Sequence, residues 1–345
     1  MITDTNQNIC SNVVCVPGAW GTHSQYSGYD ILADRLEDLG AKIARSRAHS
    51  FTARLTAKIW LEASGLSGRK LCRVYGVRTF LDERRLRLSA AGSTIVHFLS
   101  AENSFSFLRR ANIVCTFHGT HRNRAGYLVS REPLKAVRAA IALTPDLARY
   151  LREVIQDVVV IPSGVDPKAF APISPSPKHP ERLRLAVVGS FMRDFDALER
   201  VLAATADRKN LEFSILGPPE QTRRFIRFSH CRILPRLPYP EYLALLQGSD
   251  ALFLPLIDGA ANTAVLEAMA CGLAVVTNSG EGPAYYVGDG GWLYGRTEEA
   301  LELLKDASFK EQCALRGQAA RKRVLERFAW ERIVPQVLDI YKRLD

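Results

Sequence analysis

The chain has 345 residues, of which 47% are hydrophobic and 24% charged, an ordinary balance for a globular protein and enough length for two domains of about 150–180 residues each. The seven cysteines form no metal-binding motif, no apolar run approaches the roughly 18 residues of a membrane-spanning helix, and the first residues do not resemble a signal peptide, so we expect a cytoplasmic protein with reduced thiols. The formal net charge is +10.

That charge is concentrated in the first half of the chain. Residues 1–165 carry 22 Lys and Arg against 13 Asp and Glu, whereas the remainder carries 24 against 23. A basic half favours a partner with an acidic surface, such as an anionic membrane or an anionic acceptor, although a merely solvated basic surface fits as well. Nucleic acid is not expected as a partner, because no nucleic-acid-binding module is recognisable.

The first half alternates predicted strands and helices, the pattern of a parallel sheet. A strand over 12–20 leads through a Gly-bearing loop into a helix over 29–39, and Ser27 and Gly28 stand where that helix begins. Further strands are predicted over 94–99, 112–117, 139–144 and 158–161, and helices over 102–110 and 146–153.

Residues 47–91 are rich in arginine and carry one readable pattern, over 51–63. Apolar residues recur there near helical spacing with two basic residues beside them: Phe51, Leu55, Ile59, Trp60, Arg54 and Lys58. This pattern is typical of an amphipathic helix that contacts a membrane surface. An ordinary surface helix packed on its own sheet is the simpler interpretation.

The strand over 112–117 ends at His118 and Gly119. A histidine at the carboxyl end of a parallel strand lies where such sheets bind ligands. A structural histidine packed on the loop is the alternative. His121 and Arg122 follow closely and are candidates to contact an anionic acceptor.

A Pro/Ser-rich linker over 171–180 precedes a second set of alternating elements. The chain shows no P-loop, GxSxG or HExxH motif. Strands are predicted over 183–188, 211–216 and 232–235, and helices over 240–247, 298–305, 311–327 and from 330 onward.

The most informative stretch is a βαβ unit over 251–278, in which a strand, a small-residue loop, a helix from about Asn262 and a second strand follow one another. The first-turn N–H groups of that helix and its dipole favour an anion such as phosphate. Thr263 and Glu267 share a helix face, so the carboxylate stands one turn behind a bound phosphate. The plain alternative makes Asn262 a helix cap and Glu267 a solvated residue.

Within this unit, LEAMACGLAVVTN resembles the signature helix of the retaining GT-B glycosyltransferases of the GT4-like group 1 family. That family carries an E-x7-E pattern, and Glu267 matches its second Glu, which binds the ribose of the donor. The first Glu falls at Gly259, so the chain departs from the pattern there. PSGVDPKAF and the Phe328-Ala329-Trp330 run resemble the hinge and the returning helix of the family.

The resemblance implies roles for individual residues. His118 and Glu267 are the implied catalytic pair, with His118 contacting the donor sugar. The donor diphosphate and sugar are assigned Gly28, Gly189, Arg193, Asn262, Thr263 and Ala264. The nucleoside is assigned Gly217, Pro218, Arg236, Leu237 and Glu267, and the acceptor Ser27, His121 and Arg122. Arg193 replaces the Gly-Arg and Lys cations of the family, because Ser190 stands where that Arg is usual.

The implied fold is α/β, with two Rossmann-like domains facing across a cleft, 1–166 and 167–328, and a C-terminal helix, 329–345, that crosses back to the first. The implied activity is transfer of a sugar, with retention, from a nucleoside-diphosphate sugar to an acceptor hydroxyl of a glycan, glycolipid or small metabolite. Neither a metal nor a further cofactor is expected. The alternatives are a non-catalytic GT-B-like partner protein and a nucleotide-sugar epimerase of the same fold.

Overall fold

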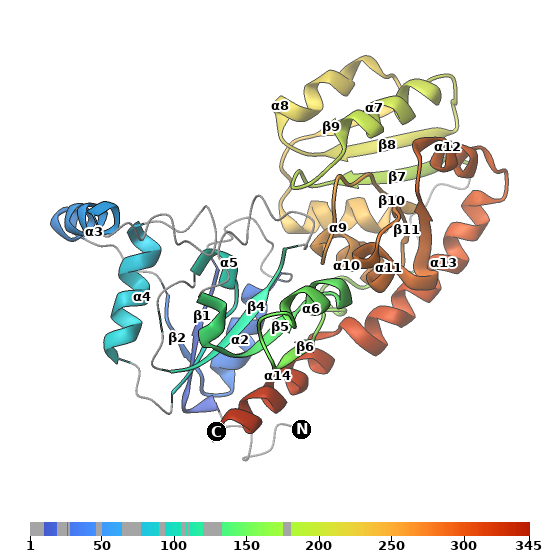
Figure 1. Cartoon of the computed structure of the whole chain (residues 1–345). Coiled ribbons are helices and arrows are strands. Elements are labelled where there is room, and N and C mark those ends of the chain that lie inside the picture. Colours follow the sequence, from blue (N-terminus) through green and yellow to red (C-terminus); the bar gives the residue numbers. More distant parts are fainter. Residues whose placement is uncertain are drawn as a thin grey trace. The chain divides into compact units, whose positions relative to one another are not determined.

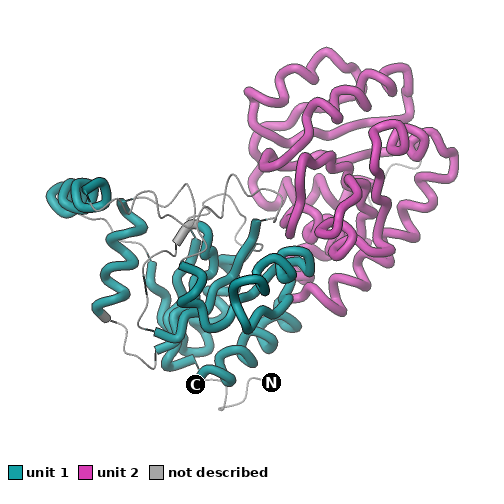
Figure 2. Tube along the Cα trace, viewed as in Figure 1, with its two compact units in different colours: residues 1–163, 330–345 teal, residues 164–329 magenta. Residues whose placement is uncertain are grey.

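The computed structural model describes residues 10–18, 26, 28–45, 50–63, 77–89, 94–104, 108, 111–119, 133–174 and 181–345. They form two compact units: unit 1 is Met1–Ser163 with Trp330–Asp345, and unit 2 is Gly164–Ala329 (Figure 2). The sequence placed the boundary after residue 166. Unit 2 begins earlier, because Val165 forms a parallel bridge with Ala329 and donates its N–H to the Phe328 carbonyl at 2.9 Å.

Unit 1 is built on a six-stranded parallel sheet of order β2-β1-β3-β4-β5-β6 (Figure 1). Its strands read as apolar runs such as IVHF and NIVCTF, and the central ones are almost wholly buried, as a sheet covered on both faces requires. Its elements are β1 Val13–Val16, α2 Asp30–Asp38, β2 Lys42–Ile43, α3 Phe51–Ala63, α4 Val77–Ser89, β3 Ile95–Phe98, α5 Ala101–Ser104, β4 Asn112–Phe117, η2 Pro133–Ala136, β5 Val137–Ala142, α6 Pro145–Leu151, β6 Val158–Val160 and α14 Trp330–Leu344.

The C-terminal helix α14 belongs to unit 1, as the predicted fold requires. Trp330, Ile333, Val337 and Tyr341 are buried along one stripe of this helix, at the spacing that faces a sheet. A short π-helical segment, η5 Val324–Phe328, precedes it. The predicted helix over 311–327 is therefore α13 followed by a change of helix type.

Unit 2 repeats the architecture with six parallel strands in the order β12-β11-β10-β7-β8-β9. Its core includes Phe213, Phe225, Phe253 and Phe309, all fully buried. Its elements are β7 Leu183–Val188, α7 Phe195–Ala204, β8 Leu211–Leu216, α8 Pro219–Thr222, η3 Arg223–Arg227, β9 Cys231–Leu234, α9 Tyr239–Gln247, β10 Ala251–Leu254, α10 Thr263–Ala270, β11 Ala274–Asn278, α11 Glu281–Val287, η4 Gly288–Gly290, β12 Gly291–Tyr294, α12 Thr297–Lys305 and α13 Phe309–Arg323.

The two-sheet α/β architecture predicted from the sequence is confirmed. Of the helix predicted over 102–110, the structure describes α5 up to Ser104 and, further along, Leu108, which is not helical. The N–H of Leu108 donates to the carboxylate of Glu83 on α4 at 2.5 Å. Among the described helices, none is both long and apolar enough to cross a bilayer.

Candidate functional site

The sheet order of unit 2 marks one crevice at the carboxyl ends of its strands. The chain runs outward from β7 to β8 and β9, and then returns to place β10 on the other side of β7. Connections leave β7 and β10 in opposite directions, and such a switch point is where open parallel sheets bind ligands. Gly189 and Arg193 follow β7, and Asn262 and Thr263 follow β10, so the predicted donor residues of unit 2 flank this point.

The turn after β7 fixes the guanidinium of Arg193. Gly189 has a φ of +85° and Met192 a φ of +57°, so the chain turns sharply and folds the arginine back beneath itself. Arg193 Nε donates to the Val188 carbonyl at 2.9 Å, and Nη1 donates to the Phe191 carbonyl at 2.8 Å. The third nitrogen, Nη2, lies 2.7 Å from the position that a Cβ on Gly189 would occupy. Two nitrogens are thus anchored, and Nη2 has no acceptor among the described residues.

Arg193 remains a cation at neutral pH. It is 8% exposed, and this burial lowers the pKa of its guanidinium to about 10, an effect that the nearby Tyr242 hydroxyl counters. A pKa near 10 still leaves the group protonated at pH 7. A buried, immobile positive charge is well suited to a phosphate, because it needs no reorganisation to meet the ligand.

The loop after β10 is tied to this turn. The N–H of Asp194 donates to the Pro255 carbonyl at 3.0 Å, and the N–H of Ile257 donates to the Met192 carbonyl at 2.9 Å. Arg193 and Leu256 also form an antiparallel bridge. Unit 2 therefore holds its two predicted anion-binding segments side by side.

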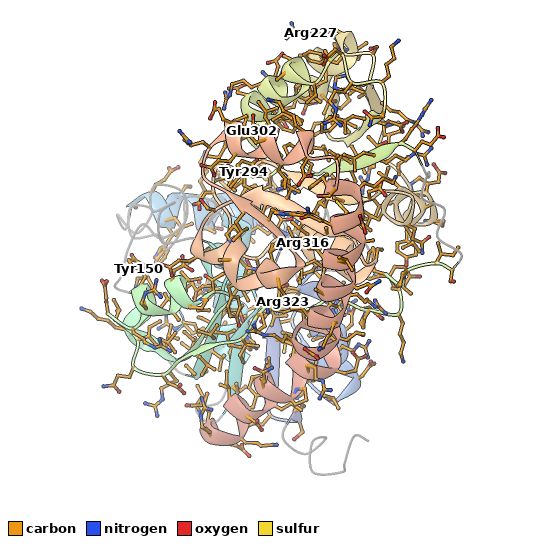
Figure 3. All side chains as sticks on the ribbon, turned by 90° about the vertical axis from the view of Figure 1, so that its right-hand side faces the viewer. Tyr150, Arg227, Tyr294, Glu302, Arg316 and Arg323 are labelled. Carbon is orange, nitrogen blue, oxygen red and sulfur yellow. The ribbon has the colours of Figure 1, made fainter. Side chains whose placement is uncertain are left out.

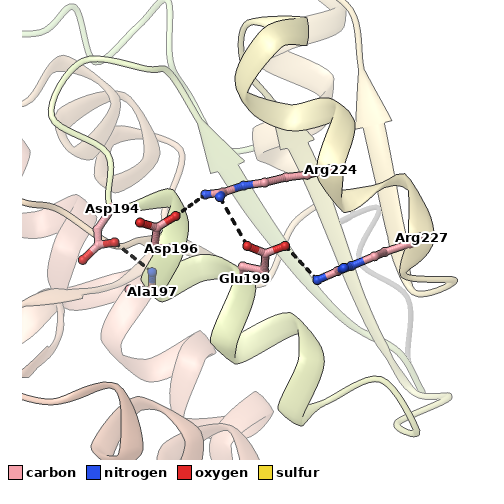
Figure 4. Close-up of polar contacts among 6 residues, drawn as sticks. All are labelled: Asp194, Asp196, Ala197, Glu199, Arg224 and Arg227. Carbon is pink, nitrogen blue, oxygen red and sulfur yellow. Dashed lines mark hydrogen bonds and ion pairs between the residues drawn. The ribbon is translucent and has the colours of Figure 1, made fainter.

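Acidic side chains occupy the N-terminus of helix α7, which follows Arg193 (Figure 4). Asp194 is its N-cap and accepts from the Ala197 N–H at 2.8 Å. Asp196 stands in the first turn and pairs with Arg224 at 2.7 Å. Two carboxylates at this helix start disfavour a bound anion, so the α10 side is the better place for one.

At the start of helix α10, only some of the backbone N–H groups have a hydrogen-bond acceptor in the described part of the chain. Asn262 is its N-cap, and Oδ1 of that residue accepts from the Ala264 N–H at 3.1 Å. One of the predicted phosphate-binding amides, that of Ala264, is thus already satisfied. The N–H groups of residues 260–263 have no acceptor in the described part of the chain. These four consecutive amides can serve an anion.

The carboxylate of Glu267 is buried one turn further along α10, with 5% of the residue exposed. The hydroxyl of Tyr242, on α9, donates to Glu267 Oε2 at 2.6 Å. Burial, and then the Glu267 charge, raise the pKa of Tyr242 well above its ordinary value, so the hydroxyl keeps its proton. The sequence analysis did not identify Tyr242, because no local pattern distinguishes it.

The predicted nucleoside residues follow β8 and β9. A Cβ on Gly217 would lie 3.5 Å from the Gly189 carbonyl and 2.9 Å from Thr222 Cγ2, so this turn packs closely beside the Arg193 turn. Pro218 caps the short helix α8. Arg236 is exposed and Leu237 half-buried beyond β9, the edge strand of the sheet.

Two other arginines of unit 2, Arg316 and Arg323 (Figure 3), have structural partners. Arg316 stacks over Trp292 at 4.4 Å and donates to the Gly291 carbonyl at 2.6 Å. Arg323 donates to the carbonyls of Tyr285 and Tyr286 at 2.7 and 2.9 Å. Arg193 differs from them because it combines such anchoring with a position at the switch point.

In unit 1, the structure fixes the tautomer of His118 at the end of β4. Its Nε2 lies 2.6 Å from the Leu99 carbonyl, which can only accept, so Nε2 carries the proton and Nδ1 is the acceptor. The backbone N–H groups of His118 and Gly119 donate to Glu102 Oε1 at 2.5 and 2.9 Å. Tyr29 meets the imidazole edge-on at 4.8 Å between ring centroids.

A chain of buried polar side chains that was not predicted from the sequence supports this region. His97, on β3, lies 2.6 Å from the Tyr341 hydroxyl through Nδ1 and 2.8 Å from Thr116 Oγ1 through Nε2. Thr116 in turn reaches the Tyr29 hydroxyl at 3.5 Å. Burial lowers the pKa of His97 to about 3, so the ring is neutral. A lone histidine inside the apolar strand IVHF was the available signal.

The remaining predicted residues are placed in part. Gly28 has a φ of +94° just before α2, in unit 1, where its carbonyl accepts from the Ile31 N–H at 3.3 Å. Ser27, His121 and Arg122 lie outside the described residues. Across the described ranges, no group of three His, Cys, Asp or Glu side chains is arranged to hold a metal ion.

Comparison with known proteins supports this picture. Residues 182–306 match the family model described as Glycosyl transferases group 1. No curated protein sequence matches the chain. Among solved structures, sucrose-phosphate synthase from Thermosynechococcus elongatus is similar with a TM-score of 0.69 and 16% identity, covering 96% of this chain and 98% of that one.

Two further structures are similar over nearly their whole length. WaaG, a glycosyltransferase involved in lipopolysaccharide biosynthesis, has a TM-score of 0.67 and 16% identity over 95% of this chain and 99% of that one. Anabaena Alr3699/HepE, solved with UDP-glucose, has a TM-score of 0.66 and 12% identity over 96% and 99%. The chain therefore has the two-domain GT-B fold, and residues 182–306 of its second unit match the family model described as Glycosyl transferases group 1.

Proposed function

We propose that the protein is a glycosyltransferase that moves a hexosyl group from a nucleoside-diphosphate sugar to an acceptor hydroxyl, with retention of anomeric configuration. The proposal rests on two groups of unit 2 that can bind an anion: the anchored guanidinium of Arg193, and the backbone amides of residues 260–263, which have no acceptor among the described residues. Glu267 follows these amides by one turn of α10. The family match and the neighbours, of which HepE was solved with UDP-glucose and with UDP, also support it.

The chemistry requires stabilisation of negative charge on the departing diphosphate. Arg193 Nη2 would meet one phosphate, and the amides at the start of α10 would meet the other. Fixed donors are effective in this role because they are already oriented when the charge develops. No side chain has to move and no metal is required by this scheme, so activity should persist in a chelator.

Glu267 would bind the ribose. Its carboxylate accepts two or more hydrogen bonds when ionised, and Tyr242 supplies one of them at 2.6 Å. The Tyr242 contact holds the carboxylate in one orientation, with the ribose hydroxyls as further donors. For His118 the resemblance implies a contact to the donor sugar. With Nε2 donating to the Leu99 carbonyl, Nδ1 of the neutral imidazole would accept a hydrogen bond from a sugar hydroxyl.

The acceptor is a glycan, a glycolipid or a small metabolite, which places the reaction in polysaccharide, glycolipid or glycosylated-metabolite biosynthesis. An acceptor that carries negative charge fits the excess of basic residues in 1–165.

The test is a thermal-shift panel of UDP, GDP, ADP, dTDP and CDP on wild type and on Glu267→Gln, which keeps the size of the side chain and an acceptor for Tyr242. A ligand at a hundredfold excess over Kd stabilises the folded state by about 2.7 kcal/mol. One nucleotide should shift wild type strongly, and Glu267→Gln should weaken its affinity about ten- to a hundredfold, the loss of a charged hydrogen bond. Glu302→Gln, an exposed carboxylate on α12, is the matched control and should bind as wild type does.

Two outcomes would count against the transferase. Stabilisation by none of the five nucleotides contradicts it and favours a non-catalytic GT-B-like protein. That alternative draws support from Gly259, the position of the missing first Glu, where a Cβ would already lie 3.0 Å from Leu256 Cδ1. Incubation of the protein with the matching nucleotide sugar, followed by sugar analysis, separates the epimerase, which would return an altered sugar without net transfer.

A further inference from the structure

Helix α3 exposes an apolar stripe that no described element covers. Phe51, Leu55 and Ile59 are 79%, 48% and 56% exposed, and they recur every four residues, so they lie on one face. The opposite face holds Ala57 and Leu61, which are buried against Phe80 of α4. Figure 1 shows α3 beside α4 in unit 1. The helix therefore has apolar side chains on two faces, and only one of these faces is packed against a described element.

Basic side chains border the stripe. Arg54 and Lys58 are exposed on the helix row next to it, one turn apart. The partner helix α4 adds exposed arginines and the 80%-exposed Leu88: its basic residues are Arg78, Arg84, Arg85 and Arg87. Residues 1–165 as a whole carry most of the net charge of the protein. The partner of this surface must therefore accept apolar side chains and carry negative charge.

The size of the stripe distinguishes between partners. A helix of 13 residues is about 20 Å long, and a stripe about 10 Å wide along it offers about 200 Å². A stable protein interface buries about 800 Å² on each side. A membrane has no such requirement, since apolar side chains insert among lipids without a shaped partner and basic groups pair with headgroup phosphates.

We propose that α3 docks unit 1 on an anionic phospholipid surface, with Phe51, Leu55 and Ile59 inserted at the headgroup boundary and Arg54 and Lys58 paired with lipid phosphates. This surface is separate from the nucleotide site of unit 2. The docking is reversible, since each basic residue contributes only about fivefold to membrane partitioning, and salt weakens that contribution.

The test is co-sedimentation of the full chain with vesicles of phosphatidylcholine alone and of phosphatidylcholine mixed with phosphatidylserine. Wild type should sediment with the anionic vesicles, less so at high salt, and poorly with the neutral ones. Phe51→Ser combined with Ile59→Ser should lower the partition coefficient more than tenfold, because two inserted side chains are lost. Arg54→Gln combined with Lys58→Gln should lower it about 25-fold on anionic vesicles, two fivefold contributions.

Matched control variants lie in unit 2. Ile226→Ser combined with Leu315→Ser removes apolar side chains that are 65% and 64% exposed, and Lys209→Gln combined with Arg232→Gln removes two exposed charges. Both should sediment as wild type does. All four variants alter exposed positions, so their melting temperatures should match wild type and exclude misfolding as the cause of any loss.

Three results would overturn the proposal. The first is failure of wild type to sediment with anionic vesicles, and the second is sedimentation of the α3 variants to the same extent as wild type. Alternatively, sedimentation velocity without lipid shows a dimer that the Phe51→Ser and Ile59→Ser pair dissociates, which assigns the stripe to a second copy of the chain. The nucleotide thermal shifts test unit 2 and do not depend on the vesicle experiments. Failure of the membrane-docking proposal is therefore distinguishable from failure of the proposed transferase.

Discussion

Replacement of Gly189 by alanine tests the role of Arg193 without touching the arginine itself. Gly189 has a φ of +85°, a conformation that costs a residue with a Cβ about 1–2 kcal/mol. The new methyl group would also lie 2.7 Å from Arg193 Nη2 and 3.4 Å from Cζ, so the guanidinium must move. We expect Gly189→Ala to lower stability and to displace the cation from the proposed diphosphate site.

The expected loss of affinity follows from the bonds removed. A hydrogen bond to a charged group contributes about 1.5–3 kcal/mol, so the Kd for the matching nucleoside diphosphate should rise about 10- to 150-fold. The nucleoside without phosphates should bind Gly189→Ala as it binds wild type, since the change is confined to the diphosphate contact. Isothermal titration calorimetry measures both affinities.

Gly288 supplies a control with the same chemistry elsewhere in unit 2. It has a φ of +54°, and a Cβ there would lie 2.8 Å from Cζ of Arg323, whose guanidinium is bound to the carbonyls of Tyr285 and Tyr286. Gly288→Ala should therefore destabilise the protein by a similar amount and leave nucleotide affinity unchanged. Equal diphosphate affinity in Gly189→Ala and wild type, with the stability loss of Gly288→Ala, would refute the assignment of Arg193.

Three further predictions concern single side chains. Burial holds the pKa of His97 at about 3, against 6.5 in the unfolded chain, so only the unfolded state binds a proton between these values. The free energy of unfolding should therefore fall as pH drops below about 6.5, by about 2 kcal/mol at about pH 5. Urea unfolding should show this acid dependence in wild type and a smaller one in His97→Gln. Asn262→Ala removes the cap of α10 and should lower the stability measured by thermal unfolding by about 1 kcal/mol. Because the change also frees the Ala264 amide, nucleotide affinity should stay within about twofold of wild type. A loss of affinity of tenfold or more would mean that the Asn262 side chain itself contacts the donor. His118→Ala should leave nucleoside-diphosphate affinity unchanged and lower kcat about a hundredfold, and an unchanged kcat would remove His118 from the proposed catalytic pair.

Local patterns were sufficient for the architecture. Apolar runs such as ALFL and NIVCTF indicate buried parallel strands, because only a strand covered on both faces tolerates an unbroken apolar sequence. The small-residue loop before Asn262 and the polar cap itself locate the start of α10, since capping involves residues only two positions apart. Single positions were less predictable: Leu108 lies inside the predicted helix over 102–110 but is not helical, and its N–H donates to Glu83, 25 residues away.

The contacts that make up the site depended on the tertiary structure. Tyr242 reaches Glu267 across 25 positions of sequence, and His97 reaches Tyr341 across 244, so no spacing rule could pair them. Arg193 was identifiable as a cation after β7, but its anchoring beneath Gly189 depends on a turn in which Met192 takes a left-handed φ that its side chain does not favour locally. The sequence by itself determined the order of strands and helices along the chain. Long-range packing decided which polar groups meet there, because the free energy of burying and pairing them arises only when distant segments come together.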